Sequence, residues 1–541
     1  MKPLLVFATL WMSTVYAAAQ QGGAGTPAGS TAPGSPIDVP DIIVKGSATL
    51  RLMTTTFLKQ TPMPTSPLSR KEMDSLNPKV KNDILALAPV SPPDTIPKPV
   101  GYDGIVSVSV GMFQTPELTA RFSGPFLGYA GTATASYVST EGYQAATDMH
   151  SLAFGIDGRR VFTGASGPFG ADYHEWSLTS RSMGYALFAT PDSAMRRDVS
   201  RFAVSTVMEH AISSMSVRSE VALGSVSMGE SLTSTKRTGE QQLRLKAEMR
   251  QRSEETEHRL DLAFDLRPFA SVLMSDNVIS YGVSTPYLGM EVDGKVGLRG
   301  GTDSEGSQKA DIVASLGIRK RFNPSIFAGL TMFRDIRNTF FSQTLAENPY
   351  VRSDARFDFT RIRLGSELIV RYTPSRTFTC DLRLGLEDHS SFLVPVSDSG
   401  SAFRLSYVPA TRTRLRAHAQ WQIGPWSQVD FNGEVRSIVD EDGNMIPYQA
   451  STVTRCAYIQ RFDDRWTAEI AVASVSSRRT SMTGSVSLPG YLYVDGRVEF
   501  AMTQVLAAFL SAQNLTNSSI FVFERYRERT AFGSLGIQWK F

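Results

Sequence analysis

Apolar and polar residues alternate along most of the chain from residue 103 to its end. The pattern is clearest between Thr411 and Ile423, where each arginine or glutamine follows a smaller or apolar residue. Successive side chains of a β-strand point to opposite faces, so this period of two predicts strands with one apolar and one polar face. Counting such stretches gives about 20 to 23 strands, and single-chain barrels take even numbers, so about 22 are expected.

The last eleven residues, 531–541, show the same alternation. Every second position counted back from the end is apolar, namely Phe541, Trp539, Ile537 and Leu535. This length suits a tilted strand that crosses the hydrocarbon core of a membrane. An edge strand of a soluble β-sandwich would show the same period, so this strand alone leaves both architectures open.

The polar faces of two predicted hairpins favour the membrane barrel. A turn centred near Pro425 would place Arg416 opposite Glu434 and Trp421 opposite Val429. A turn centred near Ser375 would place Glu367 opposite Arg383 and Arg363 opposite Glu387. Opposite charges at matching positions are expected where side chains crowd into a closed lumen. The residues predicted to line the lumen are Arg361, Arg363, Glu367, Arg383, Glu387, Arg412, Arg414, Arg416, His418 and Glu434.

Turn lengths between the predicted strands alternate. Gly424-Pro425 and Asp463-Asp464 are tight, whereas 437–448 and 476–490 are longer and polar. Outer-membrane barrels have short periplasmic turns and longer extracellular loops. We therefore assign the tight set to the periplasm and the long set to the outside.

The N-terminal residues predict export. Residues 1–19 combine a positive start, a short apolar run and the small residues Ala17, Ala18 and Ala19, which is typical of a secretory signal peptide. Residues 20–40 are mostly Gly, Ala, Ser, Thr, Pro and Gln and predict a flexible, low-complexity leader. A capping box at Ser69 and Glu72 and a proline at Pro89 bound two short predicted helices.

Composition limits the alternatives. The chain is 42% hydrophobic, and no apolar run after residue 19 is long enough for a membrane-spanning helix, so a helical membrane protein is excluded. The net charge of +3 on 541 residues predicts no nucleic-acid partner. Cys380 and Cys456 are too few for a disulfide scaffold, and whether they pair stays open.

Catalytic chemistry is not indicated. The six histidines are scattered without metal-ligand spacing, and the sequence has neither a Gly-x-Ser-x-Gly elbow nor a phosphate-binding glycine loop. Acid and histidine neighbours such as Asp388-His389 recur mostly at predicted strand ends, where polar rim residues are expected. His418, between Arg416 and Gln420 on one face, is expected to face the lumen rather than act as a base. We predict no enzyme and no cofactor.

Several motifs resemble those of TonB-dependent receptors. The end of the chain, with 513–517 closing one strand and 533–541 forming the last, is similar to the end of that family, as is 131–143 early in the barrel. Asp41 to Gly46 resembles the start of the family's plug, and 82–90 looks like the plug helix that precedes a proline. The resemblance implies an outer-membrane β-barrel that transports a solute.

The chain departs from this family in its plug. Only 83 residues separate the predicted signal from the first predicted barrel strand, fewer than a family plug needs. We therefore expect a reduced plug-like segment at 41–102 and a barrel at 103–541. Asp41, Ile42, Ile43 and Val44 are either an energy-coupling segment or an ordinary strand that tethers the leader.

Two functions follow from this interpretation. The first is passage of a solute across the bacterial outer membrane; the alternative is a non-transporting barrel that serves as an anchor or partner in a surface assembly. Expected partners are outer-membrane lipid and the barrel-assembly machinery, which would bind the C-terminal strand. Contact with the inner-membrane energy transducer depends on the reduced plug. The sequence names no ligand.

Overall fold

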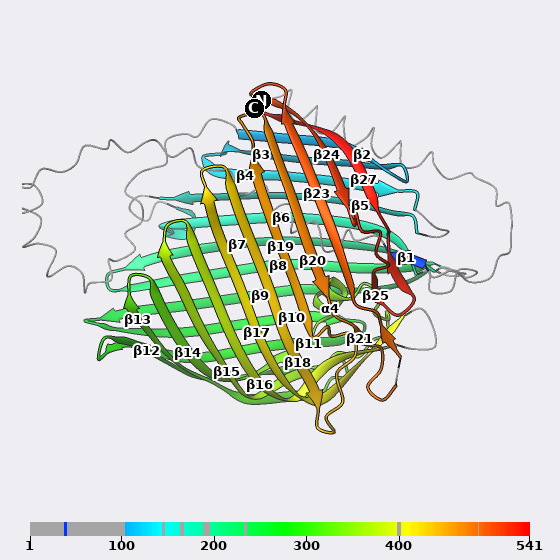
Figure 1. Cartoon of the computed structure of the whole chain (residues 1–541). Helices are drawn as coiled ribbons and strands as arrows, with labels where there is room; N and C mark the ends of the chain where they lie inside the picture. Colours follow the sequence, from blue (N-terminus) through cyan, green and yellow to red (C-terminus); the bar gives the residue numbers. More distant parts are fainter. Residues whose placement is uncertain are drawn as a thin grey trace, which may run out of the picture. The chain divides into compact units, whose positions relative to one another are not determined.

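The computed structural model describes residues 37–39, 103–142, 147–162, 167–187, 195–231, 235–397, 402–484 and 486–541. These residues form a closed antiparallel barrel of 22 strands (Figure 1), which confirms the predicted fold class and strand number. The predicted signal peptide and plug-like segment, including Asp41 to Val44, lie outside the described residues. Of the predicted leader only β1 (Ile37–Val39) is described, and it pairs in parallel with β26 (Tyr526–Glu528).

The barrel strands follow one another around the wall in chain order. Its first half consists of β2 (Asp103–Gly111), β3 (Thr115–Phe126), β4 (Tyr129–Thr140), β5 (Met149–Val161), β6 (Tyr173–Leu187), β7 (Met195–Ile212), β8 (Met215–Ser231), β9 (Thr235–Ser253), β10 (Thr256–Phe269), β11 (Val272–Tyr287) and β12 (Met290–Thr302). The second half consists of β13 (Gln308–Asn323), β14 (Ile326–Asn338), β15 (Phe359–Ser375), β16 (Phe378–Ser397), β17 (Phe403–Gly424), β18 (Ser427–Asp440), β19 (Thr452–Arg461), β20 (Trp466–Val475), β23 (Tyr491–Ala501), β24 (Leu506–Gln513) and β27 (Phe532–Lys540).

Short elements lie in the connections. They are the 3₁₀ turn η1 (Pro168–Gly170), the helix α4 (Phe341–Glu347), and the strands β21 (Arg478–Arg479), β22 (Ser487–Leu488), β25 (Phe521–Phe523) and β26. Within the described part of the chain, no helix is both long and apolar enough to span a membrane.

The apolar face of the strands points outward. Leu384, Leu415 and Val435 on neighbouring strands are 40–52% exposed, as lipid-facing side chains must be when the protein is considered without its membrane. Large exposed aromatic residues gather at the strand ends beside the tight turns, as in the aromatic girdles of outer-membrane barrels. They include Phe126, Tyr287, Phe322, Trp421, Trp426, Phe462, Trp466 and Trp539.

The C-terminal strand closes the barrel. β27 pairs with β24 on one side and with β2 on the other, so the two ends of the wall meet there. The Gly104 amide donates to the Phe541 carbonyl at 2.7 Å, and the Phe541 amide donates to the Gly104 carbonyl at 2.9 Å. Leu535, Ile537, Trp539 and Phe541 are 42–65% exposed on the outer face.

The register of one predicted hairpin is confirmed and that of the other is wrong. Arg416 lies opposite Glu434 and Trp421 opposite Val429. On the β15–β16 hairpin, however, Glu367 lies opposite Gly385 and Gly365 opposite Glu387. β15 continues through Pro374 and Ser375, so the turn is formed by residues 376 and 377 and the register moves by two positions.

A β-bulge explains why Arg363 lacks its predicted partner on the same β15–β16 hairpin. Arg363 has no partner in the β15–β16 register, because the pairing skips from Ile362 opposite His389 to Leu364 opposite Asp388. An inserted residue of this kind locally disrupts the ladder. The predicted pairing of Arg363 with Glu387 is therefore also wrong.

Most connections are short at one end of the barrel, where 162–172 is the exception, and the longest connections lie at the other end. The tight end includes 376–377 and 425–426, and the long end includes 339–358, 441–451, 476–490 and 514–531. Several strands also exceed the ten or so residues that a membrane crossing needs: β16 has 20 residues and β17 has 22. The wall therefore extends beyond the hydrocarbon layer.

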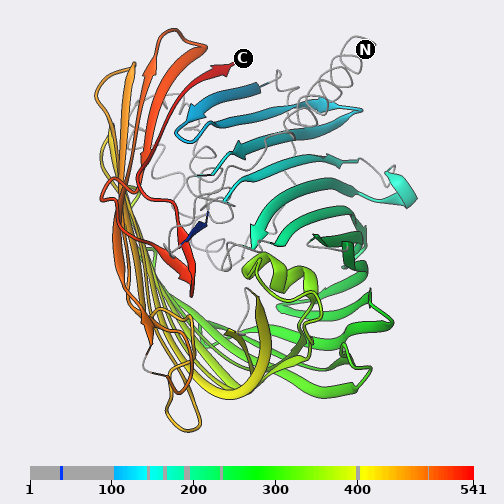
Figure 2. The same ribbon diagram turned by 90° about the vertical axis from the view of Figure 1, so that its right-hand side faces the viewer.

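The longest connection, 339–358, folds into the barrel instead of away from it. Its helix α4 lies inside the ring of strands (Figure 2). Phe341 and Leu345 of α4 are at most 2% exposed and belong to an apolar cluster with inward-facing wall residues. The cluster also contains Tyr350 from the same connection and Phe403, Tyr448, Phe523 and Tyr526 from other long-end segments. We call this assembly of long-end connections the mouth cluster.

Candidate lumen site

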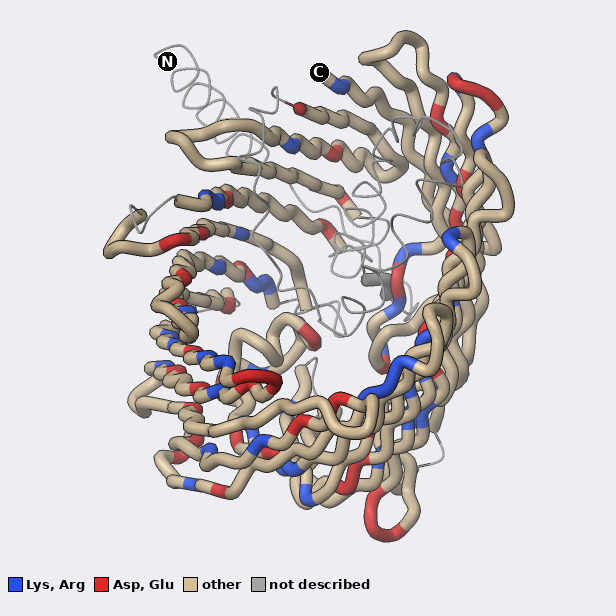
Figure 3. The backbone as a smooth tube through the Cα atoms, turned by 90° about the vertical axis from the view of Figure 1, so that its left-hand side faces the viewer, with Lys and Arg blue, Asp and Glu red and all other residues tan. Residues whose placement is uncertain are grey.

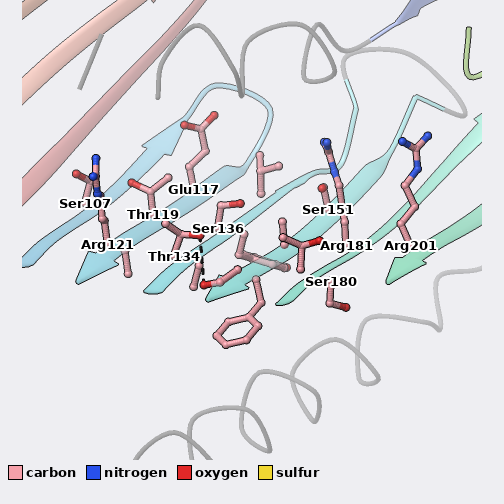
Figure 4. A pocket seen from close by; sticks show the side chains of 18 of the residues that line it. Ser107, Glu117, Thr119, Arg121, Thr134, Ser136, Ser151, Ser180, Arg181 and Arg201 are labelled. Carbon is pink, nitrogen blue, oxygen red and sulfur yellow. Dashed lines mark hydrogen bonds between the residues drawn. The ribbon is translucent and has the colours of Figure 1, made fainter. Parts of the chain in front are cut away.

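A cavity of about 720 Å³ lies inside the barrel against one continuous stretch of wall, which runs from β19 through β27 and on to β2 to β9. Small and hydroxyl-bearing residues form much of its surface, and Figure 4 shows Ser107, Thr119 and Ser136 among them. Ser342 of α4 also borders the cavity. The connection that forms the mouth cluster is therefore also part of the cavity wall.

One row of inward-facing side chains crosses several strands of this wall. Ser107 pairs with Thr119, Thr119 with Ser136, and Ser136 with Ala153. The row continues with Arg181 on β6 and Arg201 on β7, which lie directly opposite each other. In Figure 4 the side chains of Arg181 and Arg201 extend side by side toward the same side of the sheet.

The cavity is rich in arginine. Six arginines border it, against four carboxylates. On β19, the Arg455 guanidinium lies 3.8 Å from both Glu469 and Asp495. Arg529 donates to Gln513 Oε1 at 2.7 Å. The carboxylates of Glu469 and Asp495 thus lie close to Arg455, which belongs to the same part of the wall.

Buried ion pairs fasten the mouth cluster to the wall. Arg267 and Glu240 are each 2% exposed, and the Arg267 guanidinium lies 2.8 Å from Glu240 and from Asp265. Arg267 Nη1 donates to Ser342 Oγ at 2.6 Å, and Ser342 Oγ donates to Glu240 Oε1 at 2.6 Å. Arg267 also stacks over the Phe340 ring at 3.8 Å. α4 is therefore bound through charge as well as apolar contact.

A second anchor lies further along the same connection. Arg197, 1% exposed, pairs with Glu230 at 2.6 Å and donates to the Pro349 carbonyl at 2.6 Å. Ser353 Oγ donates to Glu230 at 2.8 Å, and the Tyr185 hydroxyl donates to the Pro349 carbonyl at 2.8 Å. Both ends of the segment 342–353 thus contact charged wall residues.

The residues predicted from the sequence to line the lumen lie in β15 to β18, outside the cavity lining. The structure joins several of them to each other: Arg416 with Glu434 at 2.7 Å, Arg414 with Glu367 at 3.5 Å, and Arg412 with Glu387 at 3.5 Å. Arg383 lies opposite Arg416. Acidic and basic residues are interspersed along these strands (Figure 3).

The remaining predicted residues have other partners. Arg361 pairs with Asp311. Arg363 pairs with Asp388 at 2.8 Å, where both side chains are more than 40% exposed. His418 Nε2 lies 3.3 Å from Asp430. The Arg363–Asp388 and His418–Asp430 contacts join neighbouring strands, whereas Arg361–Asp311 reaches from β15 past β14 to β13. None of these contacts involves the mouth cluster.

The described residues contain no candidate metal centre. They contain no group of three or more His, Cys, Asp or Glu side chains that could hold a metal ion. Cys380 and Cys456 are both free, which answers the question of their pairing that the sequence left open.

The sequence interpretation missed the arginines of the cavity and the inward connection. Arg181 and Arg201 lie in ordinary alternating strands, so only the register between those strands brings them together. Residues 339–358 did carry a signal: they interrupt the alternation for longer than any other connection and contain Phe340, Phe341, Tyr350 and Phe357. Apolar aromatic residues in a long connection indicate that it packs against the protein.

Comparison with known proteins gives a clear result for the fold. No protein-family model and no curated protein sequence matches the chain. Among solved structures, the chain is similar to the copper transporter OprC, with a TM-score of 0.64 and 9% identity over 82% of this chain and 84% of that one. It is also similar to the FrpB iron transporter from Neisseria meningitidis (F3-3 variant), with a TM-score of 0.61 and 8% identity over 82% of each chain.

A third similar structure is the ferric-catecholate import receptor Fiu from E. coli K12, with a TM-score of 0.60 and 11% identity over 81% of each chain. At these identities the likeness shows the fold. The chain has the barrel fold of these three structures, which are a copper transporter, an iron transporter and a ferric-catecholate import receptor.

Proposed function

We propose that this protein carries a solute through its barrel and that the connection 339–358 gates the passage. The observation that supports this is the inward position of α4, whose Ser342 both borders the lumen cavity and binds the buried Arg267–Glu240 pair. A connection that projects into the lumen narrows the path there. Movement of 339–358 would widen it.

The mouth cluster suits such a gate because its contacts are separable from the barrel wall. The wall is held by backbone pairing between neighbouring strands, which does not depend on residues 341–355. The segment itself is held by aromatic packing, such as Tyr350 stacked on Tyr526 at 3.7 Å, and by the two arginine anchors. Movement of residues 341–355 away from the wall would therefore leave the ring of paired strands intact.

Single-channel conductance in a planar bilayer tests this proposal. The refolded full chain is compared with a variant in which residues 341–355 are replaced by a short Gly/Ser linker. We expect few or brief openings for the full chain and large, steady openings for the variant. The matched control is Gln343→Ala, which changes an exposed position of α4 and should behave like the full chain.

The alternative function is a barrel that anchors a surface assembly. The same observation supports it, because the connection 339–358 occupies the mouth of the barrel. This alternative predicts that the linker variant is as silent as the full chain although it folds. Folding is checked by the resistance of the barrel to unfolding in detergent at room temperature. Silence in a folded linker variant would therefore contradict gated passage and favour the anchor.

The N-terminal residues add further proposals. We infer that residues 1–19 are removed on export, that 20–40 form a leader, and that 41–102 act as a reduced plug before the barrel at 103–541. Energy coupling would then require contact between the inner-membrane transducer and the segment Asp41 to Val44. The outward apolar residues Leu535, Ile537, Trp539 and Phe541 are the proposed contact for the barrel-assembly machinery.

A further inference from the structure

Arg181 and Arg201 form a pair of like charges on the inner wall. They lie directly opposite each other on β6 and β7, and directly opposite side chains in an antiparallel pair have their Cβ atoms about 5 Å apart. Like charges at such positions are destabilising unless a counter-charge is present. The arrangement therefore calls for an anion.

No carboxylate in the described part of the chain forms an ion pair with this pair of arginines. Within that part, the Nε atoms of both are buried without a hydrogen-bond partner. Other inward arginines differ: Arg299 lies 2.7 Å from Asp276, and Arg334 lies 2.6 Å from Asp311. Glu240, which lies in the same row two strands from Arg201, is already bound by Arg267 and Ser342.

The surroundings of the pair fit an oxygen-rich anion. Ser136 and Ser151 on β4 and β5 border the same cavity, and so does Arg121 on β3. Figure 4 shows these side chains along the wall that leads to Arg181 and Arg201. Guanidinium groups bind carboxylate and phosphate oxygens through paired hydrogen bonds, and hydroxyl groups can donate to the remaining oxygens.

We propose that Arg181 and Arg201 form an oxyanion-binding site in the lumen, which takes a carboxylate or phosphate group. This inference rests on the proposed function, since the most direct source of the anion is a solute that passes through the barrel. The same chemistry is available from the chain itself. Residues 1–102 contain six carboxylates: Asp38, Asp41, Glu72, Asp74, Asp83 and Asp94.

Calorimetric titration of the refolded full chain with citrate and with inorganic phosphate, at fixed ionic strength, tests the site. We expect Arg181→Gln/Arg201→Gln to weaken binding of the better probe by about tenfold or more, because charge-assisted hydrogen bonds are lost. The matched control is Arg383→Gln/Arg416→Gln. These two arginines also lie directly opposite each other, but Arg416 has Glu434 as its partner.

A third variant identifies the source of the anion. In it the six N-terminal carboxylates are replaced by their amides. If a solute fills the site, this variant binds citrate as the unchanged chain does. If a carboxylate of the chain fills the site, the variant binds citrate more tightly, and the oxyanion site stands with an internal occupant. Equal binding by the Arg181/Arg201 variant and its control, or no binding by any form, overturns the proposal.

Conductance separates this inference from the proposed function. In the 341–355 linker variant, the reversal potential in a salt gradient should shift toward cation preference when Arg181 and Arg201 are replaced. Steady openings with an unchanged reversal potential would contradict the anion site and leave gated passage intact. A silent linker variant that still binds citrate through the two arginines would contradict gated passage and keep the site.

Discussion

Arg267 Nη1 donates a hydrogen bond to Ser342 Oγ at 2.6 Å, and this contact joins strand β10 of the wall to helix α4 of the inward connection. The two residues are 75 positions apart in the sequence. Arg267 is 2% exposed and also holds Glu240 and Asp265. The gate and the wall thus share one buried charged network.

Removing Arg267 should destabilise the protein strongly. Arg267→Met would leave Glu240 buried without its cation, and breaking a buried pair in this way costs about 3–5 kcal/mol. Urea unfolding followed by tryptophan fluorescence measures the loss. Arg337→Met is the control, because Arg337 is 65% exposed and its pair with Asp335 should contribute about 0–1 kcal/mol. Similar losses in both variants would contradict the role given to the network.

Phe341→Ala should loosen the inward connection without opening the barrel. Phe341 is fully buried, and its ring centroid lies 5.4 Å from that of Phe269 and 6.0 Å from that of Phe357. Truncating a buried phenylalanine costs about 3–5 kcal/mol. We expect faster proteolytic cleavage within 339–358 than in the full chain, while the strands stay intact. Gln343→Ala should be cleaved at the rate of the full chain.

The docking of this connection should weaken as pH rises. Desolvation by the surrounding protein raises the pKa of the Glu347 carboxyl, although its side chain keeps some access to solvent. An acid with a raised pKa in the docked state favours docking at pH below its ordinary value. That contribution is lost as pH rises from the ordinary value through the raised one. Cleavage within 339–358, measured between about pH 4 and pH 7, should therefore accelerate with pH, and Glu347→Gln should remove this dependence.

A methyl group at Gly536 should disturb the seam of the barrel. A Cβ at this position would lie 2.6 Å from the Val108 carbonyl oxygen and 2.7 Å from the Ser109 Cβ, both on the neighbouring strand β2. Crowding of this kind typically costs about 1–3 kcal/mol. We expect Gly536→Ala to lower the fraction of folded barrel in outer-membrane extracts, as judged by heat-dependent migration on gels. Gly533→Ala on the same strand meets its nearest atom only at 3.9 Å and should fold normally.

The sequence anticipated local features well where alternation is regular. The period of two in residues 411–423 predicted one apolar and one polar face, and the tight turn near Pro425 then fixed Arg416 opposite Glu434. The same reasoning failed one hairpin earlier because Pro374 and Ser375 belong to strand β15 rather than to the turn. Since register depends on the turn and on bulges, a shift of one residue in the turn centre moved every predicted pair by two.

By itself, then, the sequence determined the class of the fold, because a lipid-facing and a lumen-facing side must alternate along each strand that crosses a membrane. It also identified the C-terminal strand and the outward row of apolar residues on it, from Leu535 to Phe541. Only the tertiary structure decided which lumen residues meet. Arg181 and Arg201 are 20 positions apart, and strand register places them opposite each other. Arg267 and Ser342 are 75 positions apart, and the folding of 339–358 into the barrel brings them into contact. Local alternation encodes neither the register nor the inward fold.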